Sequence, residues 1–307
     1  MDFSETLEKT DFMLAEAAVI EALRRSGAAA LHPRLENALL IYDDVGRTAL
    51  TGVYRDYVSI ARQARVPILI CTPTWRANLE RISAAGVTSD VNGDAVAFLK
   101  QLRNQWMDRP SSLFIGGLVG CKNDCYKPAE GLSTSAAEVF HLVQVHQLAA
   151  AGVDLLLAAT LPAVDEACGI ALAMQTTGLP YIISFVINRR GCILDGQSLE
   201  QAFQIIDTAC DRPPLGYMIN CAYPSFLRAH EQPLKVLTRL IGIQANASSC
   251  DHAELDGSER LQADAVDDWG DRMLLLNRRH GIKILGGCCG TGPAHLEYLI
   301  HHYRKSS

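Results

Sequence analysis

The chain has 307 residues, of which 49% are hydrophobic and 20% charged, an ordinary balance for a globular protein that can bury a full core. Its formal net charge of −6 gives no reason to expect nucleic-acid binding, and no cluster of Lys and Arg lines one helix face. No apolar run reaches the roughly eighteen residues of a membrane span, so we expect neither nucleic acid nor membrane as a partner.

The cysteine content indicates a reducing compartment. Asp2 and Glu5 stand where a signal peptide would carry basic residues followed by an apolar run. Ten cysteines in a chain without an export signal are expected to be reduced thiols, some buried and some binding metal, rather than a disulfide framework. We therefore expect a cytoplasmic protein.

Apolar runs alternate with helical patterns along the chain. The first apolar run covers 12–15 and precedes an Ala/Leu/Glu-rich helical pattern at 17–25, while 28–50 has no clear pattern. The elements predicted after residue 50 are, in order, helix 51–65, strand 66–72, helices 76–85 and 92–108, strand 113–119, helix 135–151, strand 153–158, helix 164–177, strand 180–186, a helix ending near 210, strand 215–221, a helix from 226, strand 240–245, helix 260–280, strand 282–285 and helix 294–303. Capping-box spacing at Ser135 with Glu138, and at Ser198 with Gln201, predicts two of the helix starts.

This alternation predicts a parallel sheet. With 12–15 counted first, eight strands in about three hundred residues favour a closed (β/α)8 TIM barrel, an α/β fold, formed by one domain over 1–307. A doubly wound open sheet is the alternative. The Gly-rich phosphate fingerprint of its dinucleotide-binding version does not follow the first strand, so we predict the barrel.

Two of the predicted strands end in cysteines. One ends in Asn220-Cys221, and the last leads into a tight turn, Gly286-Gly287-Cys288-Cys289. Because the C-terminal ends of barrel strands open onto one mouth, we expect the three sulfurs to converge. Three thiolates suit one Zn²⁺ ion with a coordination position left free, as in catalytic zinc sites. The alternatives are three buried cysteines that act as small hydrophobes, or a strained disulfide between the adjacent pair.

Five residues near the expected mouth are candidates for substrate binding: Trp75, Asn220, Asn246, Gly286 and Gly287. An indole face would suit a cationic methyl donor, but a tryptophan in this position can also serve as core or lid packing. Both asparagines can alternatively satisfy backbone groups of a turn. The remaining cysteines are expected to be structural or ordinary loop thiols, and they are Cys71, Cys121, Cys125, Cys168, Cys192, Cys210 and Cys250.

These motifs resemble the zinc-dependent homocysteine S-methyltransferases, whose members use betaine, S-methylmethionine or folate as methyl source. The likeness rests on Ile219-Asn220-Cys221 and on the stretch from Gly286 to Thr291, with weaker similarity at 54–57, 184–185 and 195–199. It covers nearly the whole chain. The resemblance implies a (β/α)8 barrel in which Cys221, Cys288 and Cys289 hold zinc and the substrate thiol becomes the fourth ligand. It also implies methyl transfer from a sulfonium or similar donor to homocysteine, which gives methionine.

Two strand ends depart from the family pattern. The family usually has Asp-Gly-Gly after the first strand, where this chain has Glu16-Ala17 preceded by Ala15, and a Glu-Thr pair after the fourth, where it has Ala159-Thr160. The family acids surround the amino group of homocysteine. Two further hypotheses therefore stand beside the first: a zinc-binding barrel with a binding or regulatory role and no such activity, and a methyltransferase for a different thiol. The methyl donor and the oligomeric state are not predicted.

Overall fold

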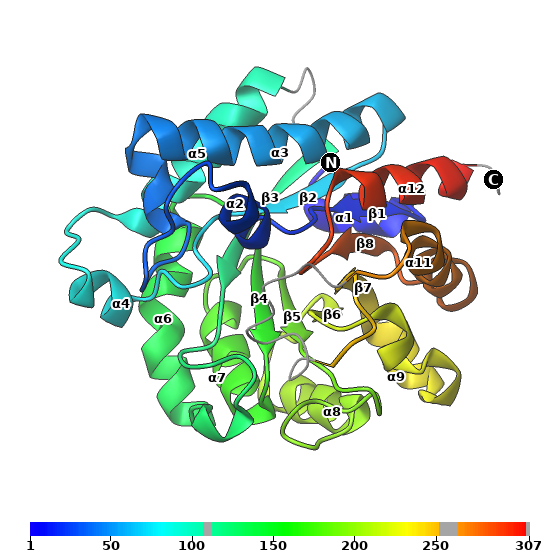
Figure 1. Cartoon of the computed structure of the whole chain (residues 1–307). Coiled ribbons are helices and arrows are strands. Elements are labelled where there is room, and N and C mark those ends of the chain that lie inside the picture. The colour runs from blue at the N-terminus through cyan, green and yellow to red at the C-terminus, as the bar shows by residue number, and fades with distance from the viewer. Residues whose placement is uncertain (107–111, 252–262, 305–307) are drawn as a thin grey trace.

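The computed structural model describes residues 1–106, 112–251 and 263–304. Eight parallel strands follow one another around a closed barrel in chain order, and β1 pairs with both β2 and β8 (Figure 1). The strands are β1 (Met13–Ala15), β2 (Ile68–Cys71), β3 (Leu113–Val119), β4 (Leu155–Leu161), β5 (Tyr181–Phe185), β6 (Gly216–Asn220), β7 (Leu240–Ala245) and β8 (Ile284–Gly287). The closure confirms the predicted (β/α)8 barrel and excludes the open sheet.

Helices surround the barrel on its outside (Figure 1). The α-helices are α1 (Phe3–Lys9), α2 (Ile20–Ser26), α3 (Asp44–Ala64), α4 (Leu79–Ala84), α5 (Val91–Trp106), α6 (Thr134–Ala150), α7 (Val164–Gln175), α8 (Leu199–Ala209), α9 (Leu234–Arg239), α11 (Val266–His280) and α12 (Pro293–Arg304). Short 3₁₀ helices occur at η1 (Ala38–Tyr42), η3 (Pro128–Glu130), η4 (Pro224–Leu227) and η5 (Ala229–Glu231). Among the described residues, no helix is both long and apolar enough to cross a bilayer.

The interior of the barrel is filled with side chains. Alternate residues of β4, such as Leu155 and Leu157, join one buried cluster with inward residues of the other strands, because successive side chains of a strand point to opposite faces. Phe3 and Leu7 of α1 belong to the same cluster, and the Phe3 ring meets Phe114 edge-on at 5.4 Å. With the interior packed and helix α1 packed against it, open space remains at the C-terminal ends of the strands.

Most predicted elements are present, but several predictions are wrong in detail. The helix predicted for 51–65, for example, already begins at Asp44. The helix predicted from 226 is instead η4 and η5, because Arg228 between them has φ of 48°, and α9 begins only after Pro233. The capping box predicted at Ser135 does not form, since α6 already begins at Thr134. The box at Ser198 and Gln201 is confirmed. The helix predicted for 260–280 begins at 266, and 107–108 and 260–262 lie outside the described residues.

Candidate metal centre and substrate pocket

Strand β7 sets the positions of the cysteines. The Cys221 N–H donates to the Gln244 carbonyl at 3.2 Å, and the Cys288 N–H donates to the next carbonyl, Ala245, at 2.8 Å. Neighbouring strands are about 4.8 Å apart, so these bonds hold the ends of β6 and β8 on either side of β7 at the same height. Backbone pairing thus brings together residues that are far apart in the sequence.

Glycines allow the cysteine turn to pass close to β1. A Cβ atom at position 286 would lie 2.7 Å from the Ala15 Cβ, and one at 287 would lie 2.1 Å from the Thr291 hydroxyl oxygen. That hydroxyl donates to the Cys288 carbonyl at 2.6 Å and accepts from the Ala18 N–H at 3.3 Å. The cysteine turn is therefore held by a hydrogen bond between its own residues and by one from the loop after β1.

The three sulfurs come together. The Sγ atoms of Cys221, Cys288 and Cys289 all lie within 4.8 Å of one another. Thiolates bound tetrahedrally to zinc at about 2.3 Å would be about 3.8 Å apart, so this donor set fits such an ion. Hydrogen bonds from Cys221 and then Cys288 hold the pKa of the Cys289 thiol well below its ordinary value, whereas the bond with Cys221 raises that of Cys288. The three thiols therefore influence one another's ionisation.

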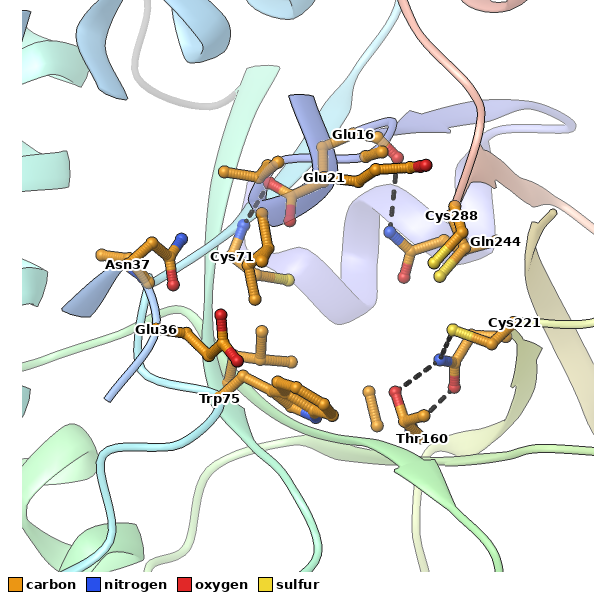
Figure 2. A pocket seen from close by; sticks show the side chains of 18 of the residues that line it. Glu16, Glu21, Glu36, Asn37, Cys71, Trp75, Thr160, Cys221, Gln244 and Cys288 are labelled. Carbon is orange, nitrogen blue, oxygen red and sulfur yellow. Dashed lines mark hydrogen bonds between the residues drawn. The ribbon is translucent and has the colours of Figure 1, made fainter. Parts of the chain in front are cut away.

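A cavity of about 360 Å³ opens beside the sulfurs, and its lining is mostly apolar. Figure 2 shows Cys221 and Cys288 on one side of it and Trp75 and Asn37 on the other. Of the predicted substrate residues, Trp75, Asn220 and Gly287 line this cavity. Its lining does not include Asn246 or Gly286.

The two predicted residues outside the lining are both buried. Gly286 packs against β1, where its missing side chain leaves room for Ala15. Asn246 follows β7 and is only 2% exposed. Its carbonyl accepts from the Trp269 indole N–H at 3.0 Å, while its side-chain Oδ1 has no hydrogen-bond partner among the described residues.

Trp75 is held at the cavity wall by two close contacts. The Arg76 guanidinium stacks over the indole at 4.0 Å from the ring centroid. Gly120 packs against the other contact point of the ring. A Cβ atom at this position would lie 2.5 Å from the indole Nε1, so any larger residue would clash with the ring. Stacking on an arginine restrains the ring while it borders the cavity.

Glu16 brings a buried carboxyl group to the cavity at the end of β1 (Figure 2). Its Oε2 accepts from the Cys71 N–H at 2.8 Å. Burial raises the pKa of Glu16 to about 8, against the opposing effect of that hydrogen bond. The side chain is therefore largely protonated at neutral pH, and a cationic group bound beside it would favour its ionised form.

The lining also includes residues that were not predicted for the site, among them Cys71, Cys125 and Tyr126. Cys71 ends β2, so the strand-end rule that identified Cys221 could have found it. Tyr126 lines the same cavity as Cys221, and the charge of that sulfur is the first cause that raises the pKa of Tyr126. Cys125 and Tyr126 belong to the loop after β3, whose path the sequence pattern does not reveal.

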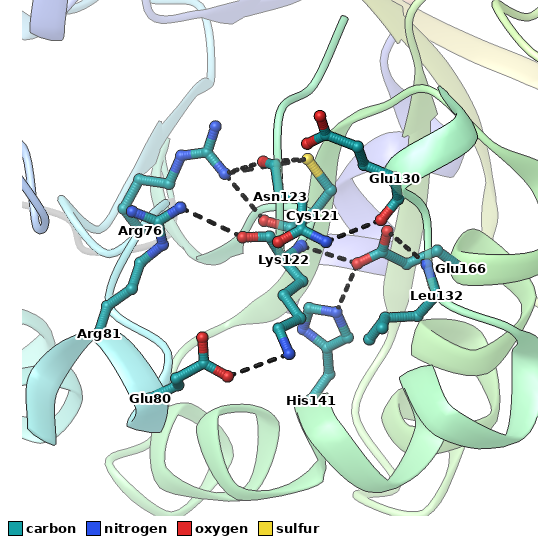
Figure 3. A network of polar contacts seen from close by, with 10 residues as sticks. All are labelled: Arg76, Glu80, Arg81, Cys121, Lys122, Asn123, Glu130, Leu132, His141 and Glu166. Atoms are coloured by element: carbon teal, nitrogen blue, oxygen red, sulfur yellow. Dashed lines mark hydrogen bonds and ion pairs between the residues drawn. The ribbon is translucent and has the colours of Figure 1, made fainter. Parts of the chain in front are cut away.

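A buried carboxylate fixes that loop (Figure 3). Glu166 of α7 accepts from the backbone N–H groups of Lys122 at 2.7 Å and Leu132 at 3.3 Å. Its Oε1 also lies 3.0 Å from Nε2 of His141 on α6, and both side chains are at most 1% exposed. The loop that supplies Cys125 and Tyr126 is therefore held at both of its ends.

Comparison with known proteins gives the same picture over nearly the full length. The family model of homocysteine S-methyltransferase matches residues 5–302. The homocysteine S-methyltransferase of Escherichia coli K12 is 24% identical over 95% of this chain and 96% of its own length. Homocysteine S-methyltransferase 4 of Zea mays is 26% identical over 54% of this chain and 49% of the maize protein.

Solved structures agree on the fold. The crystal structure of the homocysteine methyltransferase MmuM from Escherichia coli in its metallated form has a TM-score of 0.76 at 20% identity and covers 97% of this chain and 98% of its own. The apo form of the same enzyme has a TM-score of 0.63 at 21% identity and covers 95% of this chain and 96% of its own. The family match confirms the resemblance seen in the sequence, together with the predicted S-methyltransferase class. The chain belongs to the homocysteine S-methyltransferase family.

Proposed function

We propose that this protein transfers a methyl group from a sulfonium or similar donor to the thiol of homocysteine, with Zn²⁺ held by Cys221, Cys288 and Cys289. The observation that carries the proposal is the convergence of three sulfurs within 4.8 Å at the edge of a cavity of about 360 Å³. Catalytic zinc sites keep three protein ligands and an open position, whereas structural sites close with four.

The metal supplies one element of the chemistry. When bound, zinc would act as a Lewis acid and lower the pKa of the substrate thiol, so that the thiol is ionised at neutral pH. The three cysteines would hold the ion. The hydrogen bond from the Cys288 N–H to the Ala245 carbonyl would fix the backbone of the cysteine turn. The mostly apolar wall would exclude water, which would otherwise solvate the nucleophile.

The transfer itself is an in-line displacement. The acceptor sulfur forms a bond to the methyl carbon while the bond from that carbon to the donor sulfur breaks, and the electron pair of the broken bond stays on the donor. A sulfonium donor leaves as a neutral thioether, the acceptor becomes methionine, and the thiol proton has passed to solvent. Trp75 lines the cavity across from the cysteines, where the ring face that Arg76 does not cover would attract a positively charged donor.

Glu16 is a candidate to recognise the amino group of homocysteine, because it stands where the family usually has an acid after the first strand. It lines the same cavity, and its carboxyl would ionise beside a bound ammonium group. Ala159 also lines the cavity and offers only a methyl group where the family usually has an acid. This supports a second candidate, a methyltransferase whose acceptor is a simple thiol without an amino-acid end.

A methyl-transfer assay separates these functions. Zinc-loaded protein is incubated with sulfonium, betaine and folate donors against homocysteine and a simple alkyl thiol, and methylated thiol is measured by mass spectrometry. We expect methionine from homocysteine, no product above background with Cys289→Ser, and retained activity with Cys192→Ser, which removes a thiol outside both the metal set and the cavity lining. Glu16→Gln should raise KM for homocysteine about tenfold, the loss of one charged hydrogen bond, and leave KM for the alkyl thiol unchanged. Faster methylation of the alkyl thiol would favour the second candidate, and no product from any pair would contradict both.

A further inference from the structure

The side chain of Asn220 uses its full hydrogen-bonding capacity within the protein. Its Oδ1 accepts from the Thr160 N–H at 2.8 Å and from the Ser184 hydroxyl at 2.7 Å. Its Nδ2 donates to the Thr160 hydroxyl at 2.7 Å and to the Cys221 sulfur at 3.3 Å (Figure 2). An amide has two acceptor positions and two N–H groups, so all four are occupied. A substrate atom could bind Asn220 only by displacing one of these partners.

These bonds surround two residues with unfavourable backbone conformations. Thr160 has φ of 63° and Cys221 has φ of 52°, both in the left-handed region that non-glycine residues rarely adopt. For the β-branched Thr160 such a conformation is strained. Asn220 contacts Thr160 at two points, its N–H and its hydroxyl, and thus stabilises the conformation in which β4 ends beside β6.

The bond to sulfur points to a role for this arrangement. Asn220 is 4% exposed and Cys221 is 5% exposed, so water does not compete strongly for the N–H group. Because three further hydrogen bonds hold the Asn220 amide, its N–H group can fix the direction of the Cys221 sulfur and offset part of the negative charge on that sulfur. Residues that donate hydrogen bonds to metal-ligating atoms orient those ligands and tune their affinity.

We propose that Asn220 is a positioning residue that aims the Cys221 sulfur at the metal position and moderates its charge, rather than a residue that binds substrate. The inference rests on the proposed zinc site. The four hydrogen bonds then serve one function. Thr160 of β4 and Ser184 of β5 fix the side-chain amide of Asn220, and this amide fixes the sulfur of Cys221, which follows β6.

The substitution Asn220→Asp tests this with little change of shape. The carboxylate keeps Oδ1 for the Thr160 N–H and Ser184, and the Thr160 hydroxyl can rotate to donate to the second oxygen. Only the contact with Cys221 turns from attractive to repulsive. The matched control is Ser184→Ala, which removes one bond to the same amide, leaves the N–H to sulfur contact intact and changes no residue of the cavity lining.

Zinc affinity is measured by competition with a chelator, and the sulfur-to-metal charge-transfer band is recorded on protein saturated with Co²⁺. For Asn220→Asp we expect affinity to fall by roughly ten- to a hundredfold and the band to shift. Ser184→Ala should stay within threefold of the wild type with an unshifted band. Wild-type affinity and spectrum in Asn220→Asp would overturn the proposal, as would an equal loss in Ser184→Ala, because that would indicate a role in stability alone.

A metal-free measurement separates this proposal from the proposed function. In apoprotein treated with iodoacetamide, alkylation of Cys221 is compared with that of Cys288 in the same sample by peptide mass spectrometry. Asn220→Asp should slow Cys221 relative to Cys288 at least fivefold, and an unchanged ratio contradicts the inference. A wild type that binds no zinc would contradict the proposed function, while this ratio would still test the contact between Asn220 and Cys221.

If Asn220→Asp does not fold, the same measurements apply to the double variant Asn220→Asp with Thr160→Gly, because glycine removes the backbone strain at position 160.

Discussion

At the scale of single residues, Glu16 gives the site a dependence on pH. Its pKa in the folded protein is about 8, against an ordinary value of 4.5, so the folded state binds the proton more tightly than the unfolded state does. Stability therefore falls as pH rises from about 4.5 to about 8 and levels off above. Burial also raises the pKa values of Tyr54 and Cys71 beside it, so these groups stay neutral throughout that interval.

The variant Glu16→Gln removes this ionisation. We expect the free energy of unfolding of the wild type to decline relative to that of the variant between pH 5 and pH 8, as measured by urea denaturation at each pH. The comparison cancels every other titrating group that the two proteins share. Parallel curves over this interval would mean that Glu16 ionises in the fold as readily as in water.

The cluster of three cysteines could be predicted from the sequence, while several of its neighbours could not. Cys221 and Cys288 follow apolar strands, and strand order in a barrel brings such positions to one mouth. Tyr126 reaches the sulfurs through the course of a loop, and Asn220 acquires its role from Thr160 and Ser184 on other strands. Contacts between side chains of separate elements have no signature in local sequence.

At the scale of elements, the loop after β3 depends on the buried pair of α6 and α7. Replacing Glu166 by Ala would leave His141 and the backbone N–H groups of Lys122 and Leu132 without their acceptor. We expect Glu166→Ala to lower the free energy of unfolding by about 3 kcal/mol, the cost of breaking a buried polar network. Urea denaturation measures it.

The control lies in the same loop. Glu130 is exposed and its carboxylate is 3.6 Å from the Lys127 ammonium group, so Glu130→Ala should change the free energy of unfolding by less than about 0.5 kcal/mol. If both variants lose the same stability, the Glu166 network does not hold this loop.

The predicted elements were most accurate where an apolar run is bounded by clear turns. The strands at 113–119 and 240–245 have the predicted limits. The prediction of a helix from 226 was wrong because Arg228 adopts a left-handed backbone conformation, which local helix propensity does not reveal. The buried pairing of His141 with Glu166 could not be predicted either, since it depends on how α6 packs against α7.

At the scale of the whole molecule, closure of the barrel completes the cluster of three cysteines. The Gly287 N–H donates to the Glu16 carbonyl at 3.1 Å, and the Gly290 N–H donates to the Glu21 carboxylate. The residue after β1 and helix α2 thus hold the cysteine turn after β8. The site therefore requires both halves of the chain, in keeping with a family match that spans residues 5–302.

The central claim is that three cysteines from two distant segments hold one metal with a coordination position free for a thiol. Zinc K-edge X-ray absorption of the wild type, before and after addition of homocysteine, tests it most directly. We expect about one zinc per chain with three sulfur ligands, which become four with homocysteine, and loss of zinc in each of Cys221→Ser, Cys288→Ser and Cys289→Ser but not in Cys125→Ser. Unchanged zinc content in the three single variants, or a sulfur count that homocysteine does not alter, would contradict the account.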